Sequence, residues 1–378
     1  MTFTPTEEQV LLRDQVHALC VEQAPPQTLR ELITDNVPWH RELWGIMGEL
    51  GLLGAAIPQA CGGVGLGPGE LAVINRELGR AVAPVPFFSS TCMAAEAIRL
   101  AGTTEQQARW LPGLATGERV ATFAWAEPSA ILTARPLATS IAGGRIRGTK
   151  TPVPDAGIAE LCVVLADRGG EDCLAVVDLD QGEVQRKPLH GFDQLRHHAA
   201  IDFRDARCEA LEAAGGNGLT RTLFDEFATL LAFEQVGGAE AALYMARDYS
   251  LERYIFGRKL GSYQAVKHKL ADIVAALELA HANALCAVES LAVESLAKDQ
   301  PDSRAAAATA RIGATEVYEA AARENLQLHG GIGFTWEADC HFHYRRARLL
   351  ALSLGSVEVW TDMLIDALAG TASHPRAA

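Results

Sequence analysis

Residues 247–272 read RDYSLERYIFGRKLGSYQAVKHKLAD, and this stretch decides how the rest of the chain is interpreted. The first part predicts a helix that ends at Phe256-Gly257, because glycine tolerates the left-handed conformation that closes a helix. A second helix is expected directly afterwards, with Gln264 at its start. Arg253 lies one turn before the glycine, so this junction is suited to hold a phosphate. The alternative is an ordinary helix end with a cationic last turn, which the helix dipole favours in any protein.

A second glycine-containing stretch favours the ligand-binding interpretation. Residues 327–334 read QLHGGIGF at the end of another helical run. Gly330, Gly331 and Gly333 lack a Cβ atom, so the backbone there can approach a ligand closely. Two separate helix ends are therefore candidates for one nucleotide site.

Together, RxxFG, the downstream Gln264 and QLHGGIGF resemble motifs of the acyl-CoA dehydrogenase family of flavoproteins. Further counterparts occur at residues 57–63, 126–128, 148–150 and 344–347, so the resemblance covers nearly the whole chain. It implies that the chain binds the adenosine diphosphate (ADP) half of an FAD that is held mainly by the neighbouring subunit. The residues implied to bind it are Arg253, Phe256, Gln264, Gln327, Gly330 and Gly331.

Composition limits the class of protein. The chain has 378 residues, 49% of them hydrophobic, and a formal net charge of −14. This net negative charge argues against nucleic acid as a partner, because binding a phosphate backbone needs a clustered excess of Lys and Arg. Its eight cysteines include no CxxC pair, so neither a zinc site nor a disulfide framework is indicated. The first residues lack the basic start and apolar segment of a signal peptide. We find no apolar run long enough to span a membrane. We therefore expect a cytoplasmic protein.

The hydrophobic periodicity changes twice along the chain. Residues 1–118 have helical patterns, beginning with a capping box from Thr6 to Gln9. Residues 119–215 contain short β-rich runs at 120–125, 138–141, 161–166, 174–177 and 200–203, and Gly143-Gly144 has the form of a hairpin turn. Residues 216–378 return to helix. We therefore predict an α+β, mainly α, fold with a helical domain, an antiparallel β domain and a C-terminal four-helix bundle, the architecture that the resemblance also implies.

Two other motifs suggest different chemistry. The glycine-rich residues 62–69 could bind a dinucleotide, but helical patterns flank them on both sides, so a structural loop is the preferred interpretation. His341 and His343 form an HxH pair that could ligate zinc in a metal hydrolase. No third and fourth ligands accompany the pair at a recognisable spacing, which favours a polar helix start instead.

The resemblance also implies a reaction that this chain is poorly equipped to perform. Members of the family remove the α proton of an acyl-CoA thioester with a carboxylate and pass the β hydrogen to the flavin, whose electrons then go to an electron-transfer flavoprotein. The two base positions of the family correspond here to Leu354 and Phe227, and neither side chain accepts a proton. We interpret the neighbouring Asp225 and Glu226 as acids on a solvated helix. Glu358, one turn past Leu354, is a weaker candidate base.

The residues implied to face the flavin ring are altered as well. The aromatic residue and the hydroxyl residue that the family places after its G-x-K motif are replaced by Pro152 and Pro154. Ala126-Glu127-Pro128 is retained, but Ala130-Ile131-Leu132 replaces the family's Gly-Ser-Asp. Two prolines also remove backbone N–H donors, so this wall is expected to hold a flavin poorly.

These losses indicate a subunit of a heteromeric enzyme. We expect a related subunit to supply the catalytic Glu and the flavin wall, while this chain contacts the FAD from across the interface. The resemblance is to α2β2 acyl-CoA dehydrogenases of bacterial steroid side-chain catabolism. Two alternatives stay open: a self-sufficient homotetramer that uses Glu226 or Asp225 as its base, and a non-enzymatic scaffold that retains the fold.

Overall fold

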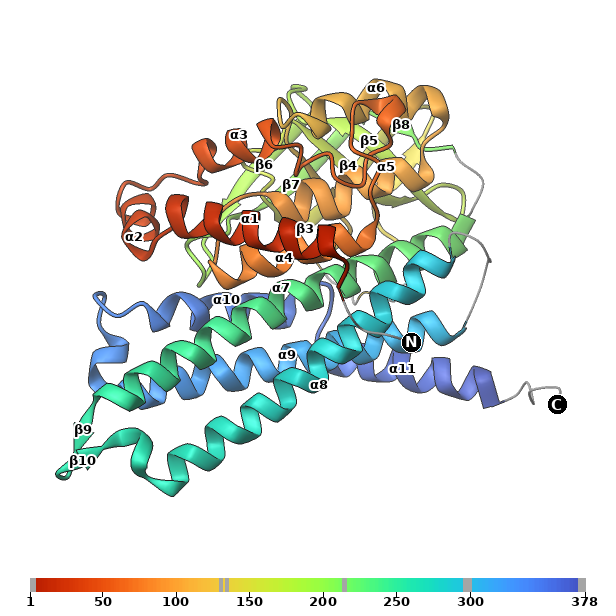
Figure 1. Cartoon of the computed structure of the whole chain (residues 1–378). Coiled ribbons are helices and arrows are strands. Elements are labelled where there is room, and N and C mark those ends of the chain that lie inside the picture. The colour runs from red at the N-terminus through yellow and green to blue at the C-terminus, as the bar shows by residue number, and fades with distance from the viewer. Residues whose placement is uncertain (1–4, 129–131, 133–135, 213–215, 295–300, 373–378) are drawn as a thin grey trace. The chain divides into compact units, whose positions relative to one another are not determined.

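The structure is a computed structural model that describes residues 5–128, 132, 136–212, 216–294 and 301–372 (Figure 1). The chain forms two compact units. The first comprises Met1–Gln27, Ala72–Ala83 and Ala228–Ala378, and the second comprises Thr28–Leu71 and Pro84–Phe227. The sequence-based boundaries at 118 and 215 describe changes of secondary structure, and the division into three domains stays a prediction.

Helices occupy the chain as far as residue 115, as expected. They are α1 (Glu7–Gln23), α2 (Pro26–Thr34), α3 (Arg41–Glu49), α4 (Pro68–Arg80), α5 (Glu96–Ala101) and α6 (Thr104–Ala115), with a 3-10 turn η1 (Gln59–Cys61) and a π-helical segment η2 (Phe87–Ala95). The capping box is confirmed, because Thr6 accepts a hydrogen bond from the backbone of Gln9 and the Gln9 side chain accepts one in return.

The strands that follow form one sheet whose order is β6-β7-β3-β2-β4-β5-β8, with β1 beside β4. Their bounds are β1 (Ala121–Ala124), β2 (Ser140–Ala142), β3 (Arg145–Pro154), β4 (Leu161–Asp167), β5 (Asp172–Asp178), β6 (Val184–Leu189), β7 (His198–Arg207) and β8 (Glu209–Ala210). The Gly143-Gly144 hairpin is confirmed, with φ of 56° and 72° at the two glycines. The predicted antiparallel β domain is present with five antiparallel strand pairings among the described residues, but the sheet is mixed, since β1 and β2 both run parallel to β4.

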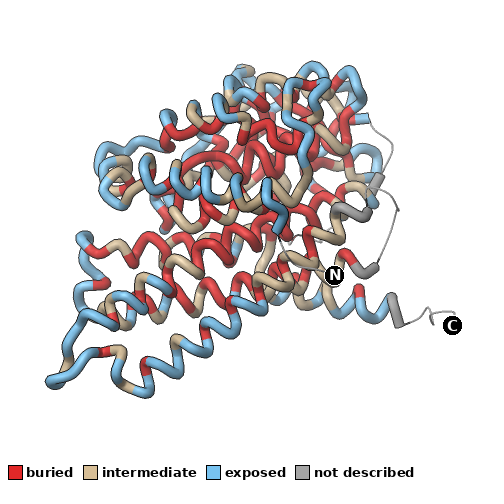
Figure 2. Tube along the Cα trace, in the orientation of Figure 1, coloured by how far each residue is buried: buried red, intermediate tan, exposed pale blue. Residues whose placement is uncertain are grey.

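The C-terminal helices, from residue 228 onward, belong to the first unit. They are α7 (Gly216–Glu252), α8 (Gln264–Glu294), α9 (Pro301–His329), α10 (Cys340–Leu352) and α11 (Val357–Ala372), and α9 packs against α8, α10 and α11. Helix α8 buries one stripe at Val266, Ile273, Leu277, Ala280 and Ala284, while its opposite face is exposed (Figure 2). These observations, with the helix and strand order, confirm the predicted fold class.

One expectation about α8 is corrected. Gln264–Leu291 passes a test of length and composition for a membrane-crossing helix. No such run was expected from the sequence. The run was missed because charged residues near its start interrupt the apolar pattern. Only 33% of its most apolar window is buried, and a core helix of a bundle passes the same test.

Candidate nucleotide site

The junction after α7 differs from the predicted pair of adjoining helices. α7 ends at Glu252, and a two-stranded hairpin of β9 (Tyr254–Ile255) and β10 (Arg258–Lys259) follows before α8 begins. Phe256 and Gly257 form the tip of this hairpin with φ of 50° and 78°. Two successive positive φ angles are the geometry of a tight hairpin turn and not of a helix end, so the glycine closes a hairpin.

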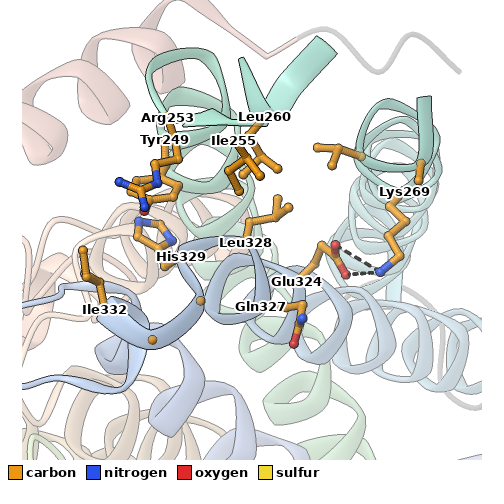
Figure 3. A pocket seen from close by; sticks show the side chains of 14 residues that line it. Tyr249, Arg253, Ile255, Leu260, Lys269, Glu324, Gln327, Leu328, His329 and Ile332 are labelled. Carbon is orange, nitrogen blue, oxygen red and sulfur yellow. Dashed lines mark hydrogen bonds and ion pairs between the residues drawn. The ribbon is translucent and has the colours of Figure 1, made fainter. Parts of the chain in front are cut away.

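Four of the six predicted cofactor residues line one cavity. Arg253 comes from the end of α7, while Gln327, Gly330 and Gly331 come from the end of α9 and the 3-10 turn η4 (Gly330–Phe334) that follows it. The cavity has a volume of about 540 Å³ and is also lined by Ile255 of the hairpin, by Leu260 and by residues of α8 (Figure 3). Two sequence motifs that are 74 positions apart at Arg253 and Gln327 therefore meet in space.

The other two predicted residues lie beside the cavity and do not line it. Gln264 is the exposed first residue of α8, directly before the lining residue Ala265. Phe256 is 94% exposed at the hairpin tip. An aromatic ring held almost wholly in water at a positive φ gains nothing within its own chain. Its exposure is consistent with a contact to something outside this chain.

The glycines at the cavity allow a special backbone conformation and leave open space, and close packing does not require them. Gly330 has a φ of 62°, which favours glycine. A Cβ atom built on Gly330 or Gly331 would meet nothing within 4 Å. The space above this backbone is therefore open toward a ligand, as a closely approaching phosphate requires.

Sequence reasoning missed several polar residues at this cavity. Tyr249 stacks on His329 with ring centroids 4.0 Å apart and an angle of 24° between the planes. Lys269 of α8 donates to both carboxylate oxygens of Glu324 at 3.1 and 3.2 Å. Tyr249 precedes Arg253 by one helical turn, which was a usable signal. The stack and the ion pair join residues 80 and 55 positions apart, so no local pattern shows them.

The electrostatics of this region differ from those of the chain as a whole. Residues 247–269 contain six Lys or Arg against two acidic residues, in a chain whose net charge is −14. Such a local excess of positive charge attracts a small anion without requiring a polyanion partner. The arrangement of cations, open glycine backbone and partly apolar walls suits the ADP part of a dinucleotide.

The residues at the two base positions are buried and apolar. Leu354 is 3% exposed in the turn between α10 and α11, where its carbonyl accepts a hydrogen bond from the Trp360 indole at 2.8 Å. Arg311 fixes the same turn by donating to the carbonyls of Leu350 and Ser353, each at 2.6 Å. Burial lowers the pKa of Arg311 to about 9. This turn is therefore well ordered by hydrogen bonds, although it holds no carboxylate at Leu354.

The second base position lies among aromatic rings. Phe227 is fully buried in the second unit, and its ring centroid lies 5.1 Å from that of Phe123 and 5.9 Å from that of Phe224. Both contacts are edge-to-face, the arrangement that aromatic pairs prefer. Phe227 is a packing residue in this structure.

The expectation that Asp225 and Glu226 lie on a solvated helix face is wrong. Each is 4% exposed, because this part of α7 is surrounded by other elements of the second unit. Burial and the nearby Glu96 raise the pKa of Glu226 well above its ordinary value, and Arg99, 4.0 Å away, opposes this only in part. A raised pKa disfavours the carboxylate form that a general base requires. Glu358 is exposed on α11.

A buried ion pair joins the two motifs at residues 126–128 and 148–150, which the resemblance places near the flavin ring. Lys150 is fully buried and donates to Glu127 at 2.9 Å and to the carbonyl of Trp125 at 3.1 Å. Burial of Glu127 opposes its ionisation, but the hydrogen bonds from Lys150 and from the backbone of Ala138 and Thr139 together lower its pKa to about 2. Glu127 and Lys150 thus hold the end of β1 to β3.

The prolines of β3 lie where its pairing with β7 is irregular. The register shifts between Lys150 and Val153, on either side of Pro152. Pro154 uses its carbonyl to accept a hydrogen bond from the Thr122 hydroxyl at 2.5 Å. Of the predicted replacement Ala130-Ile131-Leu132, residues 130 and 131 lie outside the described residues.

The two alternative motifs are engaged in other contacts. The 62–69 loop packs closely at Gly63, where a Cβ atom would lie 2.1 Å from the Ile57 carbonyl oxygen. His343 contacts the Tyr318 hydroxyl at 3.2 Å, and burial lowers its pKa to about 4. His341 instead stacks on Trp336. The two imidazoles of the HxH pair therefore have different partners.

A mainly helical chain with a mixed sheet and a basic, glycine-containing cavity is consistent with a protein that binds a nucleotide cofactor. Comparison with known proteins narrows this class. Residues 6–118 match the acyl-CoA dehydrogenase N-terminal domain, and residues 208–369 match the acyl-CoA dehydrogenase C-terminal domain. The chain belongs to the acyl-CoA dehydrogenase family, whose members use FAD to oxidise acyl-CoA thioesters.

Among its relatives is the acyl-CoA dehydrogenase IpdE2 of Mycobacterium tuberculosis, which is 30% identical over 352 residues, or 91% of this chain and 92% of that protein. Two similar solved structures are a variant of the Tcur3481-Tcur3483 steroid acyl-CoA dehydrogenase and the ChsE4-ChsE5 complex from Mycobacterium tuberculosis. The first is 30% identical with a TM-score of 0.88 and covers 97% of this chain and 99% of its own. The second is 26% identical with a TM-score of 0.89 and covers 99% and 100%.

Proposed function

We propose that this chain is the base-lacking subunit of a heteromeric FAD-dependent acyl-CoA dehydrogenase. A related subunit carries the catalytic Glu and most of the FAD, and this chain binds the ADP half across their interface. The enzyme introduces an α,β double bond into an acyl-CoA thioester and passes its electrons to an electron-transfer flavoprotein. FAD, when bound, accepts the hydride, and the residues of this chain only bind and orient its nucleotide end.

The observation that carries the proposal is the contrast between two sites. Arg253, Gln327 and the glycines after α9 line one open cavity. The two base positions hold the buried side chains of Leu354 and Phe227. A homomeric enzyme needs both a nucleotide site and a base in each chain. This chain offers the first without the second.

FAD fits the cavity residues by charge and by shape. Arg253 can pair with the diphosphate, and Gln327 offers both a donor and an acceptor. Gln264 and the exposed Phe256 extend the site beyond the cavity, where a second subunit would complete it. The two similar structures described above are titled as a steroid enzyme and as a complex of two components. By that likeness we propose an α2β2 assembly acting on a CoA thioester of a steroid side chain.

The homotetramer that uses Glu226 has less support. Glu226 is 4% exposed, and burial and the neighbouring Glu96 raise its pKa well above its ordinary value, so the carboxylate form that a base requires is disfavoured. The non-enzymatic scaffold differs from the proposed subunit only in the activity of the complex, and the experiment below separates the two.

The test is co-expression with the product of the neighbouring gene, followed by flavin absorbance and acyl-CoA oxidation of each species. We expect little flavin and no turnover in this chain alone, and one FAD per heterodimer with turnover in the complex. Arg253→Ala should lower the FAD occupancy of the complex, whereas Arg247→Ala should not, because Arg247 is exposed and paired with Asp248 outside the cavity. Full flavin and turnover in this chain alone would refute the proposal, and an inactive complex would favour the scaffold.

A further inference from the structure

His329 occupies a position at the cavity that the motifs do not explain. It is the last residue of α9 and lies directly before Gly330. Its ring stacks on Tyr249 of α7, and both rings line the cavity together with Arg253 (Figure 3). The stack fixes the plane of the imidazole at the place where the nucleotide is proposed to bind.

One hydrogen bond defines how the His329 ring is turned. Its Nδ1 lies 2.8 Å from the carbonyl oxygen of Asn325, one turn earlier in α9. A carbonyl only accepts, so Nδ1 carries a proton and donates it. The other nitrogen, Nε2, lies on the far side of the ring and has no hydrogen-bond partner among the described residues. Nε2 can therefore gain a second proton without losing the bond to Asn325.

The charges at the cavity suit an anion beside His329. The C-terminal end of α9 carries a partial negative charge, which favours a cation at this position. Arg253 of α7 and Lys269 of α8 line the same cavity, and Lys269 is paired with Glu324. A diphosphate bound beside His329 and Arg253 would favour the protonated imidazole, which donates from both ring nitrogens.

We propose that His329 is a proton-coupled phosphate ligand, which together with Arg253 holds the diphosphate of the bound dinucleotide in its imidazolium form. This inference rests on the proposed function, because it assigns a role within the same ADP site. Protonated His329 would be a second cation at that site beside Arg253, and it carries its charge only after it takes up a proton.

The test measures binding of ADP-ribose to the full-length chain, alone and in the co-expressed complex prepared without flavin. ADP-ribose carries the diphosphate as a diester, so it lacks the terminal phosphate that titrates near pH 6 and would obscure the result. Calorimetry in two buffers of different ionisation enthalpy gives the number of protons taken up. We expect net proton uptake on binding near pH 7 and an affinity up to ~10-fold higher at about pH 5.5 than at about pH 8.

Three variants separate the proposed role from a structural one. His329→Gln should abolish the proton uptake and flatten the pH profile at the weaker affinity. His329→Lys should flatten it at the tighter affinity, because the lysine keeps its charge throughout. His268→Gln should retain the wild-type profile, since His268 is exposed on α8 outside the cavity. Thermal melts confirm that each variant is folded.

The outcomes are distinguishable. Proton uptake that persists in His329→Gln, or a wild-type affinity that does not change with pH, would overturn the role of His329 while leaving the nucleotide site intact. A chain and complex that bind no ADP-ribose at any pH would overturn the nucleotide site itself, and the proposed function with it.

Discussion

Loss of one partner of the buried Glu127–Lys150 pair should strongly destabilise the second unit. A fall of the Glu127 pKa from its ordinary 4.5 to about 2 corresponds to about 3 kcal/mol. Removing one partner leaves a buried charge without compensation, which typically costs about 3–5 kcal/mol. We therefore expect Lys150→Met to destabilise the protein by about 3 kcal/mol, with Glu127→Gln costing a similar amount.

Urea unfolding followed by tryptophan fluorescence measures this effect, because the carbonyl of Trp125 accepts a hydrogen bond from Lys150. The double variant should cost less than the sum of the two single variants, since it removes both charges. Arg147→Met is the control: Arg147 lies on the same strand, its pair with Asp205 is exposed, and the unfolding midpoint should not change. Additive single effects, or a loss below about 1 kcal/mol in Lys150→Met, would refute the reasoning.

The same pair sets an acid limit on stability. The folded state lowers the pKa of Glu127, so the contribution is complete above about pH 4.5 and is lost as the pH falls toward about 2. In Lys150→Met the carboxyl no longer has its main partner, and the pH dependence in this window should be shallower. An unchanged acid-unfolding profile in the variant would show that the backbone hydrogen bonds alone account for the shift.

Three further predictions concern other positions. Gly237→Ala should destabilise the protein by more than about 2 kcal/mol, since its Cβ would lie 1.9 Å from the Arg76 carbonyl oxygen, whereas Gly45→Ala meets nothing within 4 Å and should be neutral or stabilising in thermal melts. Glu226→Gln should stabilise the protein at pH 8 and progressively less toward pH 4.5, because a raised folded pKa means that the wild type loses stability as the pH rises. Leu354→Glu should produce no acyl-CoA oxidation by this chain alone, and robust turnover from that single change would contradict the assignment.

The sequence predicted the order of helices and strands well, because periodicity and capping are local. The capping box at Thr6 and the turn at Gly143-Gly144 are both determined by residues next to them in the sequence. The parallel pairing of β1 with β4 was missed, since it depends on residues 40 positions apart. The strand β6 was also missed because it lies at the edge of the sheet with mostly exposed side chains and so lacks the alternation that marks a strand.

The sequence identified the motif residues of the candidate site. It did not predict that the acids Asp225 and Glu226 are buried. Arg253 and Gln327 belong to patterns that a single sequence displays. Asp225 and Glu226 look like surface residues in any window, and only the packing around α7 shows that they are buried. The same limit applies to His329, whose stacking partner Tyr249 comes from another helix.

Two of the motif residues expected near the flavin ring, Glu127 and Lys150, have a structural role that is separate from redox chemistry. Glu127 and Lys150 join β1 to β3 through a fully buried pair, and the loss of either leaves the other as an isolated charge. Pro152 and Pro154 carry no such penalty, because neither side chain is charged. Substitutions at Pro152 and Pro154 therefore leave no buried charge behind, whereas substitutions in the ion pair do. The Glu127–Lys150 pair is thus evidence of the fold, and the proposed function rests on the cavity at Arg253.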